Sequence, residues 1–263
     1  MNAPPPVRKL KMVIAYNGRL YHGWQRQAKG IRTVQEFVES IARKVLRHPL
    51  NLMGASRTDT GVHAEGQVAI VVSPNFSVPL QGLRRAINAR LPEDIEIRSI
   101  KEVPMTFHPS LSADAKTYRY RLCTQPNRPV HLVGQVWKYE QPLDIERVRA
   151  ASRLLLGRHD FASFTTEKDD RACTVRTLFR CDVCETDIGL DLIFDGDGFL
   201  YNMVRNLVGT LMDIGRGRWE PDKIRELLAN PVKCSFGRTA PPDGLTLMCL
   251  HYPPEAEALP AKN

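Results

Sequence analysis

The segment Gly54–Ala64 has the residue types and spacing of a site that presents one carboxylate to a ligand. Its sequence, GASRTDTGVHA, places Asp59 in a turn among a cation, two hydroxyls, a glycine and an imidazole. Turns of this kind lie at the surface and keep a carboxylate accessible. The plainer alternative is a polar hairpin loop in which Asp59 hydrogen-bonds its own backbone. The candidate substrate-binding residues of this loop are Arg57, Thr58, Gly61 and His63.

A second candidate segment, Lys116–Tyr120, alternates basic and aromatic side chains at the start of an expected strand. In a strand, Tyr118 shares one face with Tyr120 and Leu122, whereas the intervening arginines share the other. Such a strand provides a platform on which a base stacks while nearby cations bind phosphates. Lys116 is therefore a further candidate for substrate binding. A half-buried strand with solvated arginines explains the segment equally well.

The third segment, Asp195–Arg205, combines a tight turn with one cation. Gly196 and Gly198 favour a turn from strand to helix, and Arg205 follows at the border of the apolar stripe of that helix. An arginine there usually extends to solvent. Its guanidinium can instead pair with a carboxylate and keep that carboxylate ionised at neutral pH. No GxGxxG or P-loop pattern indicates a nucleotide cofactor.

The first half of the chain predicts the elements that position the Asp59 loop. Alternating apolar residues predict strands and apolar residues at helical spacing predict helices, and Thr33–Glu36 has the form of a capping box. The order β-α-β-β-α-β is that of a split βαβ, or ferredoxin-like, unit. The expected strands are 10–16, 51–53, 67–72 and 95–103, and the expected helices are 34–46 and 80–89.

The second half repeats this order with longer elements. Because turn residues accumulate between 104 and 112, we expect a first α+β subdomain at 1–106, a second at 107–253 and a flexible tail at 254–263. The expected strands are 118–122, 175–185, 190–194 and 245–252, and the expected helices are 145–156, 203–212 and 222–228.

Composition favours a globular protein with a polyanionic partner. The chain has 263 residues, 43% hydrophobic and 25% charged, with a formal net charge of +8. This basic balance favours nucleic acid. The N-terminus lacks the pattern of a signal peptide, and no apolar run approaches the roughly 18 residues that cross a bilayer. We therefore expect a cytoplasmic protein that does not contact a membrane.

Six irregularly spaced cysteines do not form the framework of a disulfide-rich domain. Cys181 and Cys184 have CxxC spacing, but no second pair completes a zinc site. In an extended segment these two residues point to opposite faces. We expect reduced cysteines and no metal site.

Together the segments around Asp59, Tyr118 and Arg205 resemble the three motifs of the TruA family of tRNA pseudouridine synthases. The resemblance implies an α+β fold in which two ferredoxin-like subdomains join their sheets into one broad, mainly antiparallel sheet. Further matches, in the family's order, are Tyr16–Gly18, Gly23–Gln27, Thr33–Glu36, Phe107–His108, His159–Phe161, Phe164, Gly198–Leu200, Met203–Arg205 and Gly244–Leu245.

The resemblance implies isomerisation of uridine to pseudouridine at positions 38, 39 and 40 of the tRNA anticodon stem-loop, with no cofactor and no metal. The N1–C1′ bond breaks, the uracil turns within the site, and C5 bonds to C1′. Members of the family work as homodimers in which each tRNA touches both subunits. A homodimer with tRNA as its partner is therefore expected.

By the same resemblance, Asp59 is the essential carboxylate. It either attacks C1′ or C6 as a nucleophile, or removes a proton from C2′ to give a glycal. Arg205 keeps this carboxylate ionised and oriented, and Tyr118 stacks on the uracil and assists removal of the C5 proton. Arg57 is suited to occupy the space that the flipped nucleotide leaves.

Three residues depart from the family pattern: Ser56 replaces a glycine, and Ser110 and Lys116 each replace an arginine. If position 56 requires a positive φ, serine costs on the order of 1 kcal/mol there. Lys116 keeps the charge but loses the bidentate fork of arginine. These departures bear on the range of targets rather than on catalysis.

The main alternative function is that of a non-catalytic RNA-binding protein or RNA chaperone on the same fold. A second alternative keeps the enzyme but changes the modified uridine or the RNA. A hydrolase built on His63 and Asp59 is disfavoured because no Ser or Cys nucleophile elbow accompanies them.

Overall fold

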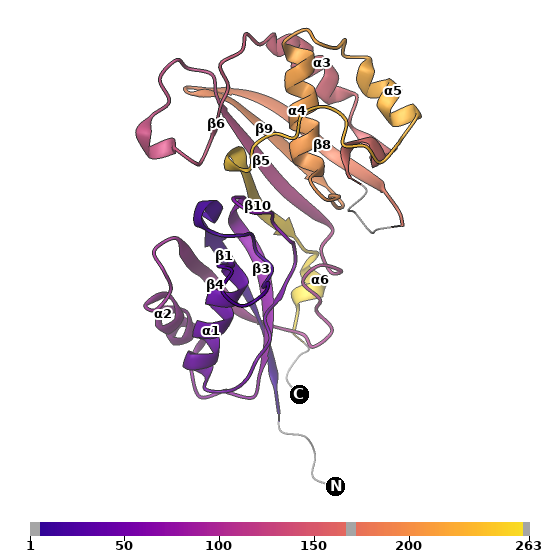
Figure 1. Cartoon of the computed structure of the whole chain (residues 1–263). Coiled ribbons are helices and arrows are strands. Elements are labelled where there is room, and N and C mark those ends of the chain that lie inside the picture. The colour runs from indigo at the N-terminus through magenta and orange to yellow at the C-terminus, as the bar shows by residue number, and fades with distance from the viewer. Residues whose placement is uncertain (1–5, 167–171, 260–263) are drawn as a thin grey trace. The chain divides into compact units, whose positions relative to one another are not determined.

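The computed structural model describes residues 6–166 and 172–259, and the chain divides into two compact units (Figure 1). The first unit comprises Met1–Asp114 and Leu247–Asn263, and the second is the continuous stretch Ala115–Thr246. The sequence placed the boundary at 106 and the final strand in the second subdomain. The structure places the change of unit after Asp114 and returns the end of the chain to the first unit.

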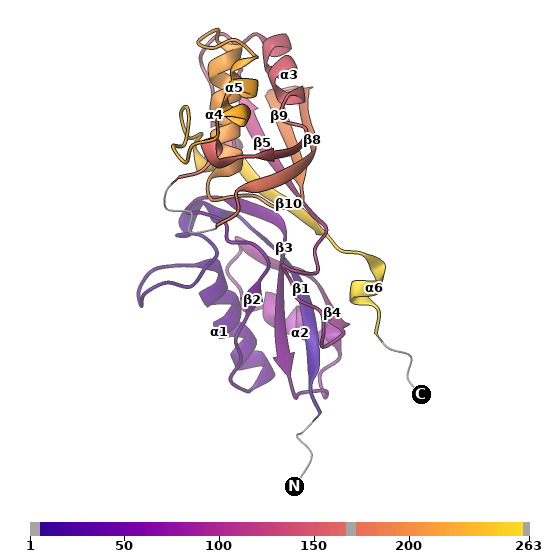
Figure 2. The same ribbon diagram turned by 90° about the vertical axis from the view of Figure 1, so that its right-hand side faces the viewer.

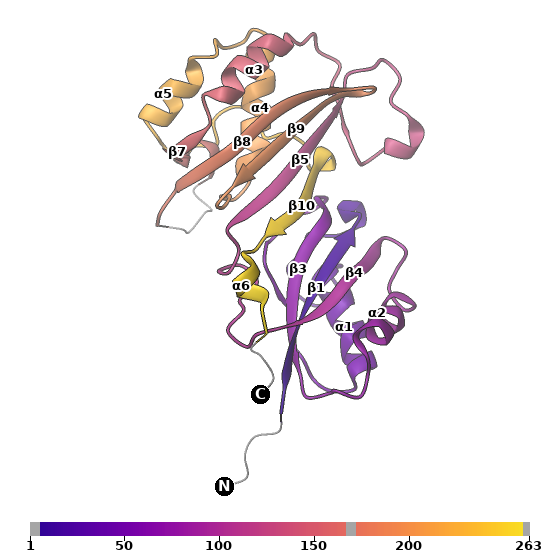
Figure 3. The same cartoon turned by 180° about the vertical axis from the view of Figure 1, so that it is seen from behind.

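The sheet of the first unit has the order β4-β1-β3-β10, with β2 also paired to β3. Antiparallel partners flank β1 on both sides. Alternation in β1 buries Leu10, Met12 and Ile14 completely and defines the core face. Figure 3 shows the strands in front of the two helices of this unit. The elements are β1 (Arg8–Tyr16), α1 (Val34–Leu46), β2 (Met53–Gly54), β3 (His63–Ser73), α2 (Leu80–Asn88), β4 (Ile95–Val103) and β10 (Leu245–His251).

Residues 252–257 pack against the other face of this sheet. Lys11 alternates with the core residues of β1, so it points away from them, yet it is only 7% exposed. Glu257, at the end of α6 (Pro254–Glu257), forms ion pairs with Lys11 and Lys101. Tyr252 packs against the buried cluster of Ile70, Val103 and Phe107. The segment 254–257 is thus helical where a flexible tail was expected, and residues 260–263 of that tail lie outside the described residues.

The sheet of the second unit has the order β5-β9-β8-β7, all antiparallel, with β6 added in parallel to β5. Gly215 ends α4, and a Cβ there would lie 2.5 Å from Leu143 and 2.6 Å from Val148, so glycine permits close packing on α3. Figure 2 shows α3, α4 and α5 together on this unit. Its elements are β5 (Ala115–Cys123), β6 (Trp137–Lys138), α3 (Ile145–Arg153), β7 (Gly157–Asp160), β8 (Val175–Thr186), β9 (Gly189–Gly196), α4 (Met203–Gly215) and α5 (Lys223–Ala229).

The expected α+β class with mainly antiparallel pairing is confirmed. The described residues also form 3₁₀ helices that were not anticipated: η1 (Gly18–Leu20), η2 (Val130–Leu132), η3 (Ala162–Phe164) and η4 (Pro242–Gly244). Within residues 6–166 and 172–259, no helix has both the length and the apolar character that a bilayer crossing requires.

Candidate functional site

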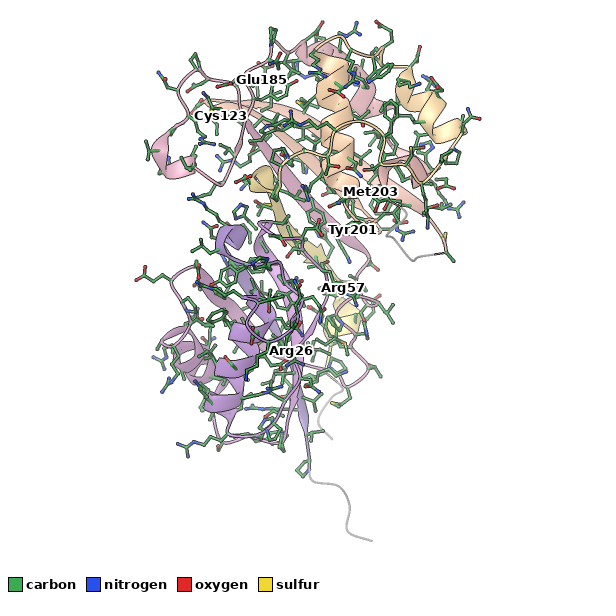
Figure 4. The ribbon with its side chains drawn as sticks, in the orientation of Figure 1. Arg26, Arg57, Cys123, Glu185, Tyr201 and Met203 are labelled. Carbon is green, nitrogen blue, oxygen red and sulfur yellow. The ribbon has the colours of Figure 1, made fainter. Side chains whose placement is uncertain are left out.

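The Asp59 loop connects β2 to β3 in the first unit. Asp59 is half-buried and Arg57, labelled in Figure 4, is exposed, whereas Thr58 and His63 are buried. The backbone N–H of Val62 donates to the carbonyl of Asp59 at 3.1 Å. The loop therefore closes as a turn with Asp59 near its surface, as its composition indicates.

Contacts to the segment after β1 hold the residue before Asp59. The Tyr16 hydroxyl and Thr58 Oγ1 share a buried hydrogen bond of 2.7 Å, and the N–H of Trp24 donates to the Thr58 carbonyl at 3.1 Å. Gly23 has a φ of +88°, and a Cβ there would lie 2.5 Å from the Thr58 oxygen. Only glycine permits this approach. Thr58 is thus fixed through both its side chain and its backbone.

A buried glutamine fixes the start of the loop. Gln67 is fully buried in β3; its Nε2 donates to the Ser56 carbonyl at 2.6 Å, and its Oε1 accepts from the Ser56 N–H at 3.2 Å. Ser56 is not among the described residues with positive φ. Serine therefore carries no left-handed strain here, and the cost considered from the sequence does not arise.

Gly61 and His63 support the far end of the loop. Gly61 has a φ of +81° and donates its N–H to the Tyr21 carbonyl at 3.2 Å. His63 Nδ1 accepts from the N–H of Gly18 at 3.1 Å, so Nδ1 carries no proton and Nε2 does in the neutral ring. His63 is only 6% exposed. Its buried ring therefore links the end of the loop to the segment after β1.

Tyr118 lies in β5 of the second unit, opposite Phe194 of β9. Its face is the predicted one, because Tyr118, Tyr120 and Leu122 are all buried. The Tyr118 ring meets Phe199 edge to face, with centroids 5.0 Å apart. Lys116, opposite Gly196, is half-buried. The β5 strand thus brings Tyr118 beside the turn that precedes α4.

The arginines on the other face of β5 have an acidic neighbour. Asp191 of β9 lies 4.0 Å from Arg119 Nε and 3.7 Å from Arg121 Nε. Burial raises the pKa of the Asp191 carboxyl, and the two guanidinium groups oppose that shift. The sequence left phosphate binding and solvation as equal alternatives for these arginines, and the structure adds Asp191 as a neighbour of both guanidinium groups.

Arg205 stands out in α4, all of whose residues the structure describes, as the one residue that is not buried. Its Nε donates to the Ala240 carbonyl at 2.7 Å, and its Nη1 donates to Asn202 Oδ1 at 3.1 Å. The Ala240 N–H returns a bond to the Arg205 carbonyl at 3.1 Å. The guanidinium is therefore held in a defined place rather than extended freely into solvent.

The second unit thus brings Tyr118 and the Arg205 segment together through Phe199, and the first unit carries Asp59, Arg57, Thr58, Gly61 and His63. Sequence reasoning missed the supporting roles of Tyr16, Gln67 and Asn202. A buried polar residue inside an apolar strand, as at Gln67, is a usable signal. No comparable feature of the sequence indicates the role of Asn202.

The two cysteines with CxxC spacing lie on opposite faces of β8, as expected of an extended segment. Cys181 is buried, and burial raises the pKa of its thiol, whereas Cys184 is exposed on the opposite face of β8. In the part of the chain that the structure describes, no group of three or more His, Cys, Asp or Glu residues could hold a metal ion.

A family described as tRNA pseudouridine synthase matches residues 12–110 and 151–253 of the chain. The chain is 37% identical over 246 residues to tRNA pseudouridine synthase A of Thermoanaerobacter sp. (strain X514), covering 94% of this chain and 100% of that protein. It is 39% identical to the protein of the same name from Syntrophotalea carbinolica, covering 94% and 97%. Among solved structures it aligns with the archaeal box H/ACA sRNP Nop10-Cbf5 complex at 10% identity and a TM-score of 0.35, over 78% of this chain and 43% of that chain.

Proposed function

Because the chain belongs to the tRNA pseudouridine synthase family, we propose that it modifies uridines 38, 39 and 40 of the tRNA anticodon stem-loop and that Asp59 is its essential carboxylate. The protein is an isomerase that converts uridine to pseudouridine in tRNA. The reaction breaks N1–C1′ and forms C5–C1′. The C5 proton leaves and N1 gains a proton, so the atoms balance without a co-substrate.

The assignment of Asp59 is supported mainly by its position in a loop whose residues before and after it are held by hydrogen bonds. Ser56 and Thr58 before it, and Gly61 after it, are each held by hydrogen bonds, while Asp59 itself stays half-buried. A carboxylate held this way keeps a fixed position relative to a bound ribose. It serves either route, attack on C1′ or C6 or removal of the C2′ proton.

Arg205 is the proposed partner of this carboxylate. Its guanidinium is anchored by Ala240 and Asn202, and an anchored cation keeps a carboxylate ionised and oriented. Tyr118 is the proposed stacking residue for the uracil and the group that assists loss of the C5 proton. Its ring is supported by Phe199.

The exposed Arg57 fits the role of filling the space left by an extruded nucleotide, which costs a few kcal/mol to flip. With Thr58, Gly61, His63 and Lys116, it forms the proposed substrate-binding set. The net charge of +8 supports salt-dependent contacts to tRNA phosphates. Three adjacent targets suggest that tRNA shape is read more than base sequence.

The family resemblance also supports a homodimer in which each tRNA touches both subunits. It further supports activity in the cytoplasm, where tRNA is used in translation. Both belong to the proposal, together with the target positions.

The test maps pseudouridine in unmodified tRNA transcripts by carbodiimide modification and primer extension. Asp59→Asn keeps the size of the side chain and removes its charge, and Asp187→Asn removes an exposed carboxylate at the β8–β9 turn as the matched control. Stops at 38–40 with the parent and control, and none with Asp59→Asn, support the proposal. Stops elsewhere refute the target positions. Equal tRNA binding without stops in any protein favours the non-catalytic RNA-binding alternative.

A further inference from the structure

Asn202 adopts an unusual backbone conformation directly before α4, between Tyr201 and Met203 (Figure 4). Its φ of 57° and ψ of 4° lie in the left-handed region, which a side chain disfavours. Among the described residues, only Arg47 and Ser235 share a positive φ without being glycine. Such conformations persist where the surrounding structure enforces them, and they cluster at functional sites.

The side chain of Asn202 does not cap the helix, although Asn202 is the N-cap residue of α4. Asparagine is among the best N-cap residues because, from an extended backbone, its oxygen reaches the first free N–H groups of the helix. At Asn202 no side-chain capping bond forms. Its Oδ1 accepts from Arg205 Nη1 at 3.1 Å instead. The left-handed backbone thus accompanies a change of partner, from the helix amides to the guanidinium of the third helical residue.

Arg205 also contacts a backbone acceptor. The Ala240 carbonyl accepts from Arg205 Nε at 2.7 Å. Two acceptors on different nitrogens fix both the position of the planar guanidinium and the orientation of its plane. The Ala240 acceptor is a backbone group, whereas the Asn202 acceptor belongs to a side chain and is lost when that side chain is removed.

We propose that Asn202 is a positioning residue for the isomerase reaction, and that its left-handed conformation serves to aim the Arg205 guanidinium. This inference rests on the proposed pairing of Arg205 with the catalytic carboxylate. The competing explanation is that residue 202 only needs a left-handed backbone for the turn between Gly198 and α4.

Two substitutions separate these explanations. Asn202→Gly accepts the left-handed backbone more readily than asparagine but removes the acceptor. Asn202→Asp keeps an acceptor oxygen on a side chain that also tolerates this conformation. Ser235→Gly is the matched control, because it relieves the same kind of backbone in the same unit, at an uncharged residue that makes no contact with Arg205 among those described.

The assay measures single-turnover release of tritium from C5-labelled uridine in tRNA, together with tRNA affinity and thermal unfolding. For Asn202→Gly we expect unchanged or higher thermal stability, unchanged tRNA affinity and a rate at least about tenfold lower, since small misplacements of a positioned group are costly. Asn202→Asp should be faster than Asn202→Gly but slower than the parent, because its carboxylate keeps an acceptor on the guanidinium yet offsets part of the positive charge that Asp59 needs. Ser235→Gly should keep the parental rate.

A parental rate in Asn202→Gly overturns the inference, because it leaves only the backbone requirement. An equal loss in Asn202→Asp and Asn202→Gly also overturns it. Arg205→Ala is measured in parallel. If that variant keeps the parental rate, the proposed role of Arg205 has failed, and the result is distinct from a failure of Asn202 alone.

Discussion

Deleting the hydroxyl of Tyr16 tests whether the bracing of the Asp59 loop sets the reaction rate. Tyr16 and Thr58 are 5% and 6% exposed, and their hydroxyl groups are 2.7 Å apart. Tyr16→Phe removes one oxygen and leaves the ring in place against Trp24. The Thr58 hydroxyl then loses this partner in a site with little access to water.

The magnitude follows from that burial. Leaving one partner of a buried hydrogen bond without the other costs about 1–3 kcal/mol, whereas removing both partners is nearly neutral. We expect Tyr16→Phe to lose about 2 kcal/mol of unfolding free energy and the double variant Tyr16→Phe/Thr58→Val to recover at least about half of that loss. In a chain of this size each kcal/mol corresponds to about 2–4 °C in Tm.

Urea unfolding gives the free energies, and single-turnover tritium release gives the rates. Because Thr58 directly precedes Asp59, we expect the rate to fall in Tyr16→Phe and to stay low in the double variant, although its stability returns. Tyr252→Phe is the control, since its hydroxyl donates at 2.5 Å to the carbonyl of Pro109, which is in the same unit but is not part of the loop. It should lose stability and keep the parental rate.

Two results would refute this reasoning. A Tyr16→Phe protein as stable as the parent would mean that the hydrogen bond contributes nothing net. A rate loss no larger than that of Tyr252→Phe would mean that the loop tolerates the change and that Asp59 is positioned by other contacts.

Two further predictions concern buried polar side chains. Gln67→Leu leaves the Ser56 N–H and carbonyl without their amide partners, and we expect a loss on the order of 3 kcal/mol by urea unfolding; a change below about 0.5 kcal/mol would contradict it. Burial raises the pKa of Tyr120 well above its ordinary value near 10, opposed by Arg205. As the pH rises, Tyr120 therefore ionises in the unfolded chain before it does in the folded protein. The free energy of unfolding is unaffected by this group below about pH 10 and falls above it, by up to about 1.4 kcal/mol per pH unit. Tyr120→Phe should show a shallower decline of unfolding free energy between pH 9.5 and 11, and parallel curves would count against it.

Much of the fold could be predicted because periodic burial is a local property. Leu10, Met12 and Ile14 alternate in the sequence and are buried together in the structure. The strands β6 and β7 were missed because they have only two and four residues, too few for a pattern. The return of β10 to the first unit is a long-range pairing that no local pattern encodes.

The candidate site divides in the same way. Asp59, Tyr118 and Arg205 could be selected as candidates because they stand in distinctive segments, and their catalytic roles stay predictions. The residues that hold the Asp59 loop in place could not be predicted. A hydrogen bond such as that from Gln67 to the Ser56 carbonyl joins a side chain to a backbone group across a loop, and no local sequence pattern reveals it. The acidic neighbour of Arg119 and Arg121 could not be predicted, because the sequence does not reveal that Asp191 lies beside them.

The two units differ in how much of the chain must be synthesised before each has all of its residues. The second unit is one continuous stretch, whereas the first needs Leu247 onward, including most of β10 and all of α6. During translation, which proceeds at about 5–20 residues per second, Ala115–Thr246 has all its residues before the first unit does. Until Met248 takes its place beside Gly66, the start of β3, which precedes the residues paired with β2, lacks a partner on this edge, and such an edge invites pairing with other chains. Part of β3 is therefore open to wrong pairing until β10 has been synthesised.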